Sequence, residues 1–120
     1  MNFIRELFNA GLSGWHSGRG HKLTRKGKYA DALNHYKLAL VHESKNGSRP
    51  NPATVECLAR TYARLGSLKE ALAAAEESYD LYKRLISKES LIAESMIRVE
   101  RFIAGLKSGN MADVNKMLKI

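Results

Sequence analysis

The chain has 120 residues, of which 44% are hydrophobic and 27% charged, with only two prolines. This composition excludes a disordered chain, and the length suits a single compact domain that can bury a core. The formal net charge is +8 and uneven, because residues 1–60 hold ten Lys/Arg against four Asp/Glu while residues 61–120 hold ten against eight. Such a surface favours acidic partners.

The only cysteine is Cys57, so no intrachain disulfide can form. The first residues carry Glu6 inside their only apolar stretch and resemble a signal peptide poorly. No stretch of the sequence is apolar for long enough to cross a membrane. We therefore expect a cytoplasmic protein without a membrane span.

Hydrophobic periodicity predicts seven helices, near residues 2–12, 15–26, 29–44, 52–65, 68–86, 89–107 and 111–119. The first carries a narrow apolar stripe suited to capping one end of the core, formed by Phe3, Ile4, Leu7, Phe8 and Leu12. The second contains Gly18 and Gly20, each of which costs a helix about 1 kcal/mol relative to Ala. Alternatively, Gly11, Gly14 and Gly18 form a smooth face for close helix packing.

A short pattern occurs three times, at residues 27–32, 66–71 and 109–114. Each copy reads glycine, polar, apolar, any residue, acid, small apolar. The glycine can end one helix in the left-handed conformation, and the acid then falls in the first turn of the next. The pattern predicts three tight turns between helices, with a small residue that lets the two helices approach closely.

Two helix starts have capping signals. Asn51 and Pro52 provide an N-cap followed by proline at the first helical position. Ser67 and Glu70 have the spacing of a capping box, in which each side chain bonds a backbone N–H of the other.

Residues 15–86 resemble two tetratricopeptide repeats, with a spacing closer to the extended kinesin-light-chain type than to the usual unit. The family's signature positions hold Gly20, Gly27, Tyr29, Ala32, Tyr36 and Ala39 in the first repeat, and Leu58, Ala59, Tyr62, Gly66, Ala71 and Ala75 in the second. Arg19 stands where the family usually has Leu, and Ser44 where it often has Pro.

The resemblance implies an all-α fold, an α-solenoid of antiparallel helix pairs with a right-handed twist. We expect one domain divided into a capping helix (1–13), a first repeat (14–46), a second repeat (51–86) and a degenerate third repeat or cap (87–120). Packed repeats of this kind present a rigid curved surface.

The resemblance also implies protein or peptide binding in a concave groove lined by the first helix of each repeat. The corresponding positions are Ser17, His21 and Arg25, followed by Glu56, Arg60 and Arg64. The arginines suit an acidic segment, because guanidinium groups bind carboxylates bidentately. The alternative is an ordinary solvated helix face.

The groove positions of the third repeat are apolar: Met96, Val99, Ile103 and Leu106. They would accept an amphipathic helix, either from a partner or from residues 2–12. The alternative is that they belong to the core. His21 and Cys57 stand where a carboxylate clamp would need Asn, so chaperone C-terminal tails are not expected as ligands.

Residues 19–28 form a basic patch of Arg19, Lys22, Arg25, Lys26 and Lys28. With Trp15 and Tyr29 nearby, the patch offers a second possibility, binding to nucleic acid or to an anionic surface. It matches no known nucleic-acid motif, and a solvated helix and turn is the simpler interpretation.

Nothing in the sequence favours catalysis or a cofactor. His16, His21, His35 and His42 are scattered without metal-ligand spacing, so no metal site is expected. The sequence predicts a non-catalytic adaptor or scaffold that binds an acidic or amphipathic segment. A self-associating structural subunit remains open, through the stripe on residues 2–12 or the acidic face at Glu76, Glu77 and Asp80.

Overall fold

A computed structural model describes residues 3–47, 49–85 and 90–119. Within these ranges the chain forms six helices and no strand. The helices are α1 (Phe3–Arg25), α2 (Tyr29–Lys45), α3 (Pro52–Arg64), α4 (Leu68–Arg84), α5 (Ser90–Ser108) and α6 (Met111–Leu118). The all-helical prediction is therefore confirmed for the described residues.

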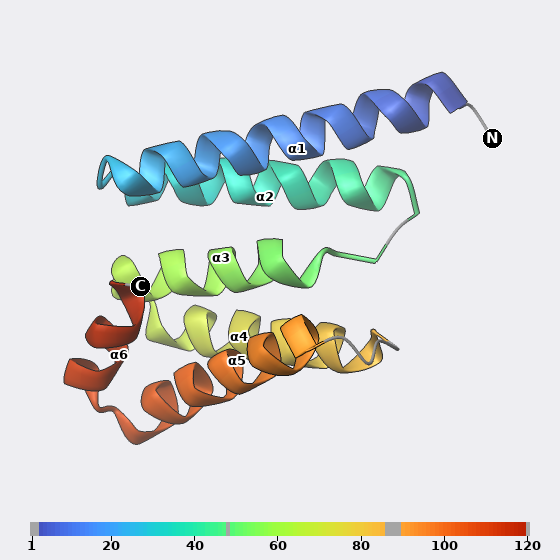
Figure 1. Cartoon of the computed structure of the whole chain (residues 1–120). Helices are drawn as coiled ribbons and strands as arrows, with labels where there is room; N and C mark the ends of the chain where they lie inside the picture. The colour runs from blue at the N-terminus through green and yellow to red at the C-terminus, as the bar shows by residue number, and fades with distance from the viewer. Residues whose placement is uncertain (1–2, 48, 86–89, 120) are drawn as a thin grey trace.

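Each helix packs mainly against its neighbour in the chain. Figure 1 shows α1 to α5 running alternately in opposite directions, with α1 at one edge of the molecule and α5 against α4 at the other. The short helix α6 turns back so that the end of the chain lies near the end of α3. This return brings the last turn of α6 to residues of α3 that are more than fifty positions earlier.

The glycines of the repeated pattern make the turns. Gly27, Gly66 and Gly109 have φ angles of 75°, 80° and 70°, in the left-handed region that favours glycine. After the first two, the next backbone N–H reaches back to close the helix, from Lys28 to the Leu23 oxygen and from Ser67 to the Tyr62 oxygen, each at 2.9 Å. The predicted turns at these three positions are confirmed.

The helix caps agree with the sequence in one of two cases. The Asn51 side chain accepts a hydrogen bond of 2.9 Å from the Ala53 N–H, as predicted. Ser67 is the N-cap of α4, but its side chain makes no capping hydrogen bond, so the capping box is wrong. Its ψ angle of 70° lies outside the extended region that directs an N-cap side chain at the helix.

The first two predicted helices are one continuous helix, so the break expected between residues 12 and 15 is wrong. Four glycines lie within it without ending it. Because α2 packs extensively against α1, tertiary contact outweighs the roughly 1 kcal/mol that each glycine costs.

The main core lies between α3, α4, α5 and α6, and includes Val55, Ala59, Ala71, Phe102 and Val114. A second, smaller cluster joins α1 and α2 through Leu23, Ala32 and Tyr36. Small buried residues at the helix contacts allow the close approach that the repeated pattern predicted, since Ala32 and Ala71 are fully buried.

Helix α1 lies close against the Tyr36 ring of α2 at Gly20. A Cβ atom there would lie 2.6 Å from Cε1 of Tyr36. At Gly11, Gly14 and Gly18 a Cβ would meet nothing within 4 Å. These three glycines therefore do not form a face for packing within this chain, contrary to one of the two interpretations of the sequence.

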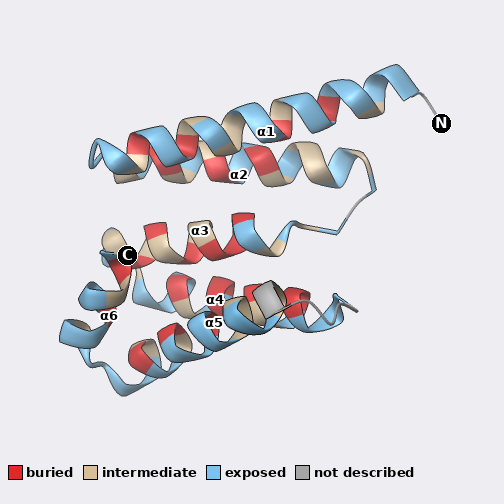
Figure 2. Ribbon diagram, in the orientation of Figure 1, coloured by how far each residue is buried: buried red, intermediate tan, exposed pale blue. Residues whose placement is uncertain are grey.

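The apolar stripe of the first residues covers nothing in the structure. Figure 2 shows the N-terminal half of α1 largely exposed, and Phe3, Ile4, Leu7 and Phe8 are 57–77% exposed. The predicted capping role is wrong because α1 turns a polar side toward α2, with Asn9 and Ser13 buried.

Candidate functional site

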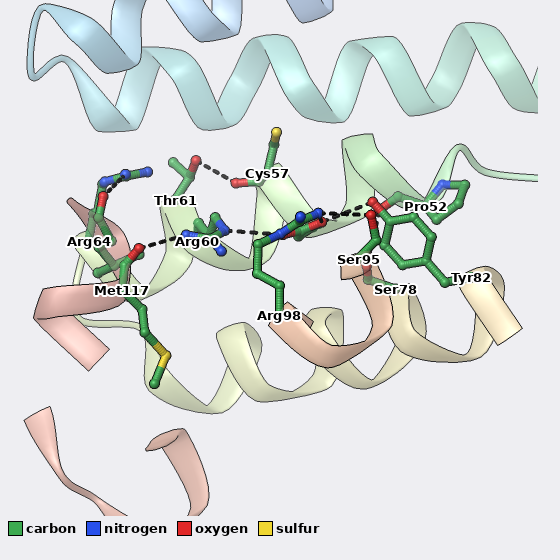
Figure 3. A network of polar contacts seen from close by, with 12 residues as sticks. Pro52, Cys57, Arg60, Thr61, Arg64, Ser78, Tyr82, Ser95, Arg98 and Met117 are labelled. Carbon is green, nitrogen blue, oxygen red and sulfur yellow. Dashed lines mark hydrogen bonds and ion pairs between the residues drawn. The ribbon is translucent and has the colours of Figure 1, made fainter. Parts of the chain in front are cut away.

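A buried carboxylate organises the face formed by α3 and α5. Glu56, only 6% exposed, accepts two hydrogen bonds from Arg98 of α5, at 2.6 and 2.7 Å. The Tyr82 hydroxyl of α4 donates a third at 2.9 Å, and Arg60 Nε donates a fourth at 3.3 Å. Figure 3 shows this network, which links three helices around one side chain.

The electrostatics keep Glu56 ionised. Burial by itself raises the pKa of Glu56, but the hydrogen bonds from Arg98 and Tyr82 and the charges of Arg98 and Arg60 bring it below its usual value. The same contacts raise the pKa of Arg98, while burial and the Glu56 charge raise that of Tyr82 to about 12. Glu56 was predicted to contact a partner. In the structure its carboxylate oxygens already accept four internal hydrogen bonds.

Arg60 and Arg64, also predicted to contact a partner, hold the last turn of α6. Arg60 Nη1 donates to the Met117 oxygen at 3.0 Å, and Arg64 Nη2 donates to the Leu118 oxygen at 2.6 Å. Carbonyls at a helix C-terminus lack partners within the helix and carry partial negative charge, so cations stabilise them. The structure therefore assigns both guanidinium groups an internal role, visible in Figure 3.

Beside this network lies a hollow of about 300 Å³ between α3, α5 and α6. It is lined by Arg60, Glu94, Ile97, Arg98, Arg101 and Met117. Ile97 is 49% exposed, which gives the hollow an apolar surface among the cations. Among the described residues, no hydrogen bond or ion pair to Arg101 is found, in contrast to Arg60 and Arg98. Arg101 is the cation of this hollow that a bound group can engage without breaking an internal contact.

The predicted contacts on the third repeat are displaced in register. Val99 is 1% exposed and therefore fits the core interpretation. Ile103 packs against the main core and also lines a shallow hollow between α4 and α5. Met96 is partly exposed but does not line the hollow. Helix α5 instead presents Ile97, Arg98 and Arg101, which sequence reasoning missed. Their spacing of one and three residues places them on neighbouring positions of a helix and could have identified them. The predicted groove face of this helix was instead chosen from other apolar positions.

A second hollow, of about 380 Å³, lies between α1, α2 and α3. It contains the predicted positions Ser17 and His21 together with Tyr36 and Cys57. The His21 ring nitrogen Nδ1 and the Tyr36 hydroxyl lie 2.9 Å apart. Burial raises the pKa of Tyr36 to about 12. Burial, and then the Glu56 charge, also raises the pKa of the Cys57 thiol. A protonated, partly buried thiol is a weak nucleophile, so the surroundings of Cys57 favour a structural role.

The basic patch lies at the end of α1 and in the turn to α2. Lys22, Arg25, Lys26 and Lys28 are exposed and Arg19 is half-buried. The two aromatic side chains expected beside the patch contact other residues. Arg64 covers the Tyr29 ring at 5.6 Å from its centroid, and Trp15 makes edge contacts with His16 and His35. Arg25, predicted for both the groove and the patch, belongs to neither hollow.

Three of the four histidines, which looked scattered in the sequence, lie together between α1 and α2. Nδ1 of His16 and Nδ1 of His35 are 2.9 Å apart, and the His16 ring stacks on His42 with centroids 5.5 Å apart. Over the described ranges, no group of three His, Cys, Asp or Glu side chains is placed to hold a metal ion. The three rings therefore contact one another without the arrangement of a metal site in these ranges.

No family model, curated protein or solved structure matches the chain. In the described part of the chain no helix combines the length and apolar character needed to cross a membrane.

Proposed function

We propose that this chain is a non-catalytic protein-interaction module, an adaptor or scaffold that holds an acidic, amphipathic segment of another protein against α3 and α5. The observation that carries the proposal is the hollow beside the Glu56 network. It combines the available guanidinium of Arg101 with the exposed side chain of Ile97. A carboxylate on the partner meets Arg101, and an apolar side chain of the partner covers Ile97 and Met117.

Preorganisation supports this assignment. Arg98 is fixed by its two hydrogen bonds to Glu56, and Arg60 by its bonds to Glu56 and the Met117 oxygen. The wall of the hollow is therefore held in place before a partner arrives. Little side-chain entropy is lost on binding when the receiving surface is already ordered.

We further propose that the helix pairs α1–α2 and α3–α4 are two tetratricopeptide-type repeats, with α5–α6 a shortened third, in an α-helical solenoid. Two similarities between the pairs support this assignment. Gly27 and Gly66 make turns with the same backbone hydrogen bond, and Ala32 and Ala71, five residues after each glycine, are both fully buried. In such an arrangement α1, α3 and α5 are the helices that face a partner.

The test compares three versions of the immobilised chain in affinity capture from native lysate: wild type, Arg101→Glu and Lys69→Glu. Lys69 is exposed at the start of α4, outside the hollow, so its reversal changes net charge equally and serves as the matched control. We expect a protein that wild type and Lys69→Glu retain and Arg101→Glu loses.

The captured protein is then titrated against each variant at two salt concentrations. We expect Arg101→Glu to weaken binding by roughly tenfold or more, which corresponds to about 1.4 kcal/mol, with the difference shrinking at high salt. Equal affinity for wild type and Arg101→Glu contradicts the assignment of the hollow. Capture of nucleic acid alone, lost on reversal of Lys22 and Lys26, would favour the basic patch instead.

A further inference from the structure

The N-terminal half of α1 presents a large apolar face that no described part of the chain covers. Phe3, Ile4, Leu7, Phe8 and Trp15 are 70%, 77%, 57%, 65% and 57% exposed. At ~150–250 Å² for an aromatic side chain, together they expose on the order of 700 Å² of apolar surface. This is at or above the largest apolar patch of a typical monomer. Two such faces together bury an area in the range of a standard, specific protein–protein interface.

The same face contains the three glycines without a role in the fold. Gly11, Gly14 and Gly18 follow the stripe at helical spacing, and the space above each is open. A shallow hollow lies over the middle of the stripe, lined by Leu7, Phe8, Gly11, Leu12 and Trp15. Phe3, Ile4, Leu7 and Phe8 stand on the N-terminal side of Gly11. The gaps at Gly14 and Gly18 lie on its C-terminal side, with Trp15 between them.

We propose that a second copy of this chain covers the face, with two α1 helices packed antiparallel about a two-fold axis at Gly11. This symmetry pairs two of the bulky residues with gaps on the other copy and brings Leu7 beside Trp15 of the other copy. Phe8 lies over Gly14 of the second copy, and Ile4 over Gly18 of the second copy. A two-fold interface must be self-complementary in this way, because each contact occurs twice. Gly11 lets the two backbones approach at the axis, as small residues do at close helix crossings.

Charge favours this place for self-association. The whole chain carries +8 and so repels its copies. Residues 3–18, however, hold only Arg5 and Glu6 as charged side chains. The apolar face is thus the part of a basic molecule where two copies meet with the least repulsion. The absence of a dense basic border along residues 3–18 also argues against an anionic lipid surface as the occupant, because such helices bind lipid with Lys and Arg beside their apolar face.

Single-cysteine variants in a Cys57→Ser background test the geometry under mild oxidation. Gly11→Cys lies on the axis and is expected to form a disulfide-linked dimer by itself, since disulfides need Cα atoms within about 7 Å. Phe8→Cys and Gly14→Cys are each expected to cross-link poorly alone and efficiently when mixed. Ala30→Cys, exposed on α2, is the control that stays monomeric. Equal cross-linking of all four variants, or none for Gly11→Cys, overturns the proposal.

Sedimentation velocity over a concentration series gives an independent readout without cysteines. Wild type is expected to show a reversible dimer, and Phe8→Glu and Gly14→Leu to weaken it by at least tenfold. Because Phe8 is exposed and the space at Gly14 is open, both variants are expected to keep the wild-type circular dichroism. A strictly monomeric wild type overturns the proposal, and so does monomeric chain that floats with vesicles of anionic phospholipid.

Discussion

Arg60 donates a hydrogen bond of 3.0 Å to the carbonyl oxygen of Met117, and this contact holds the last turn of α6 against α3. Since α6 is only eight residues long, it is too short to be stable as an isolated helix. Its position depends on this bond, on the parallel bond from Arg64, and on the burial of Val114 and Leu118.

Replacing Arg60 by Met keeps most of the side-chain volume but removes the guanidinium. We expect a loss of about 1–2 kcal/mol in the free energy of unfolding, as for a hydrogen bond made by a charged group, and faster amide hydrogen exchange in α6. Arg101→Met is the matched control and is expected to change stability by less than about 0.5 kcal/mol. Unchanged exchange in α6 of Arg60→Met would show that the bond does not hold this helix.

The substitution Glu56→Gln tests the carboxylate that links α3, α4 and α5. At neutral pH we expect a loss of about 2–3 kcal/mol in the free energy of unfolding, because Arg98, Arg60 and Tyr82 lose a charged acceptor in a buried place. Urea titration measures the loss. A change below about 0.5 kcal/mol would mean that solvent replaces these contacts.

Acid adds a second readout at Glu56. Its pKa is lower in the folded chain than its reference value of 4.5, so the folded state binds the proton less readily than the unfolded state. The stabilisation is therefore complete above the unfolded pKa and is lost as the pH falls through the folded value. Wild type is expected to lose more stability than Glu56→Gln between pH 6 and pH 3.

Gly20→Ala is expected to destabilise the chain although Ala favours helices. The new methyl group would lie 2.6 Å from Cε1 of Tyr36, and displacement of a buried ring costs about 1–3 kcal/mol. Gly18→Ala is the control, since its Cβ would meet nothing within 4 Å. It is expected to gain about 0.5–1 kcal/mol from helix propensity. Thermal unfolding of dilute samples separates the two, and a melting temperature for Gly20→Ala at or above wild type contradicts the close approach.

The histidine cluster is expected to make stability fall in mild acid. Burial, followed by the charges of His35 and His42, lowers the pKa of His16 below 6.5. The neutral ring is therefore the form that the fold favours, and its stabilisation is present above the unfolded pKa and lost as the pH falls below it. Asn9 contacts His42, and Glu43, the acid next to His42 in the chain, accepts a hydrogen bond from Ser13.

The substitution His16→Gln removes the titrating ring. We expect the free energy of unfolding of this variant to change less between pH 7.5 and pH 5.5 than that of wild type. Parallel pH profiles for the two proteins would place the acid sensitivity elsewhere.

Helix positions and turns followed from the sequence because their causes are local. The glycines at 27, 66 and 109 and the Asn51–Pro52 start act through backbone geometry, which the chain carries in a few consecutive residues. The length of α1 did not follow, since the packing against α2 that keeps its glycines helical comes from residues 29–45.

The candidate site was only half predictable for a related reason. Arg60 lines the hollow, but its bond to Met117 joins residues 57 positions apart, and no local pattern encodes that contact. Glu56 was predicted to face a partner because the sequence does not reveal its internal partner Arg98, 42 positions away. The outward turn of the apolar stripe was missed because sequence reasoning assigns apolar residues to the interior, whereas α1 meets α2 through Asn9 and Ser13.

The seam between the N-terminal half of α1 and the end of α2 consists of hydrogen bonds, whereas two packed helices normally meet through apolar side chains. Asn9 bonds to His42 and Asn46, and Asn46 also donates to the Glu6 oxygen. Separation of these two segments exposes little new apolar surface, so its free energy depends weakly on urea. Because the fold lowers the pKa of His16, which lies beside the seam, the same separation favours proton uptake by this ring. Acid, more than urea, is therefore expected to separate the N-terminal half of α1 from the end of α2.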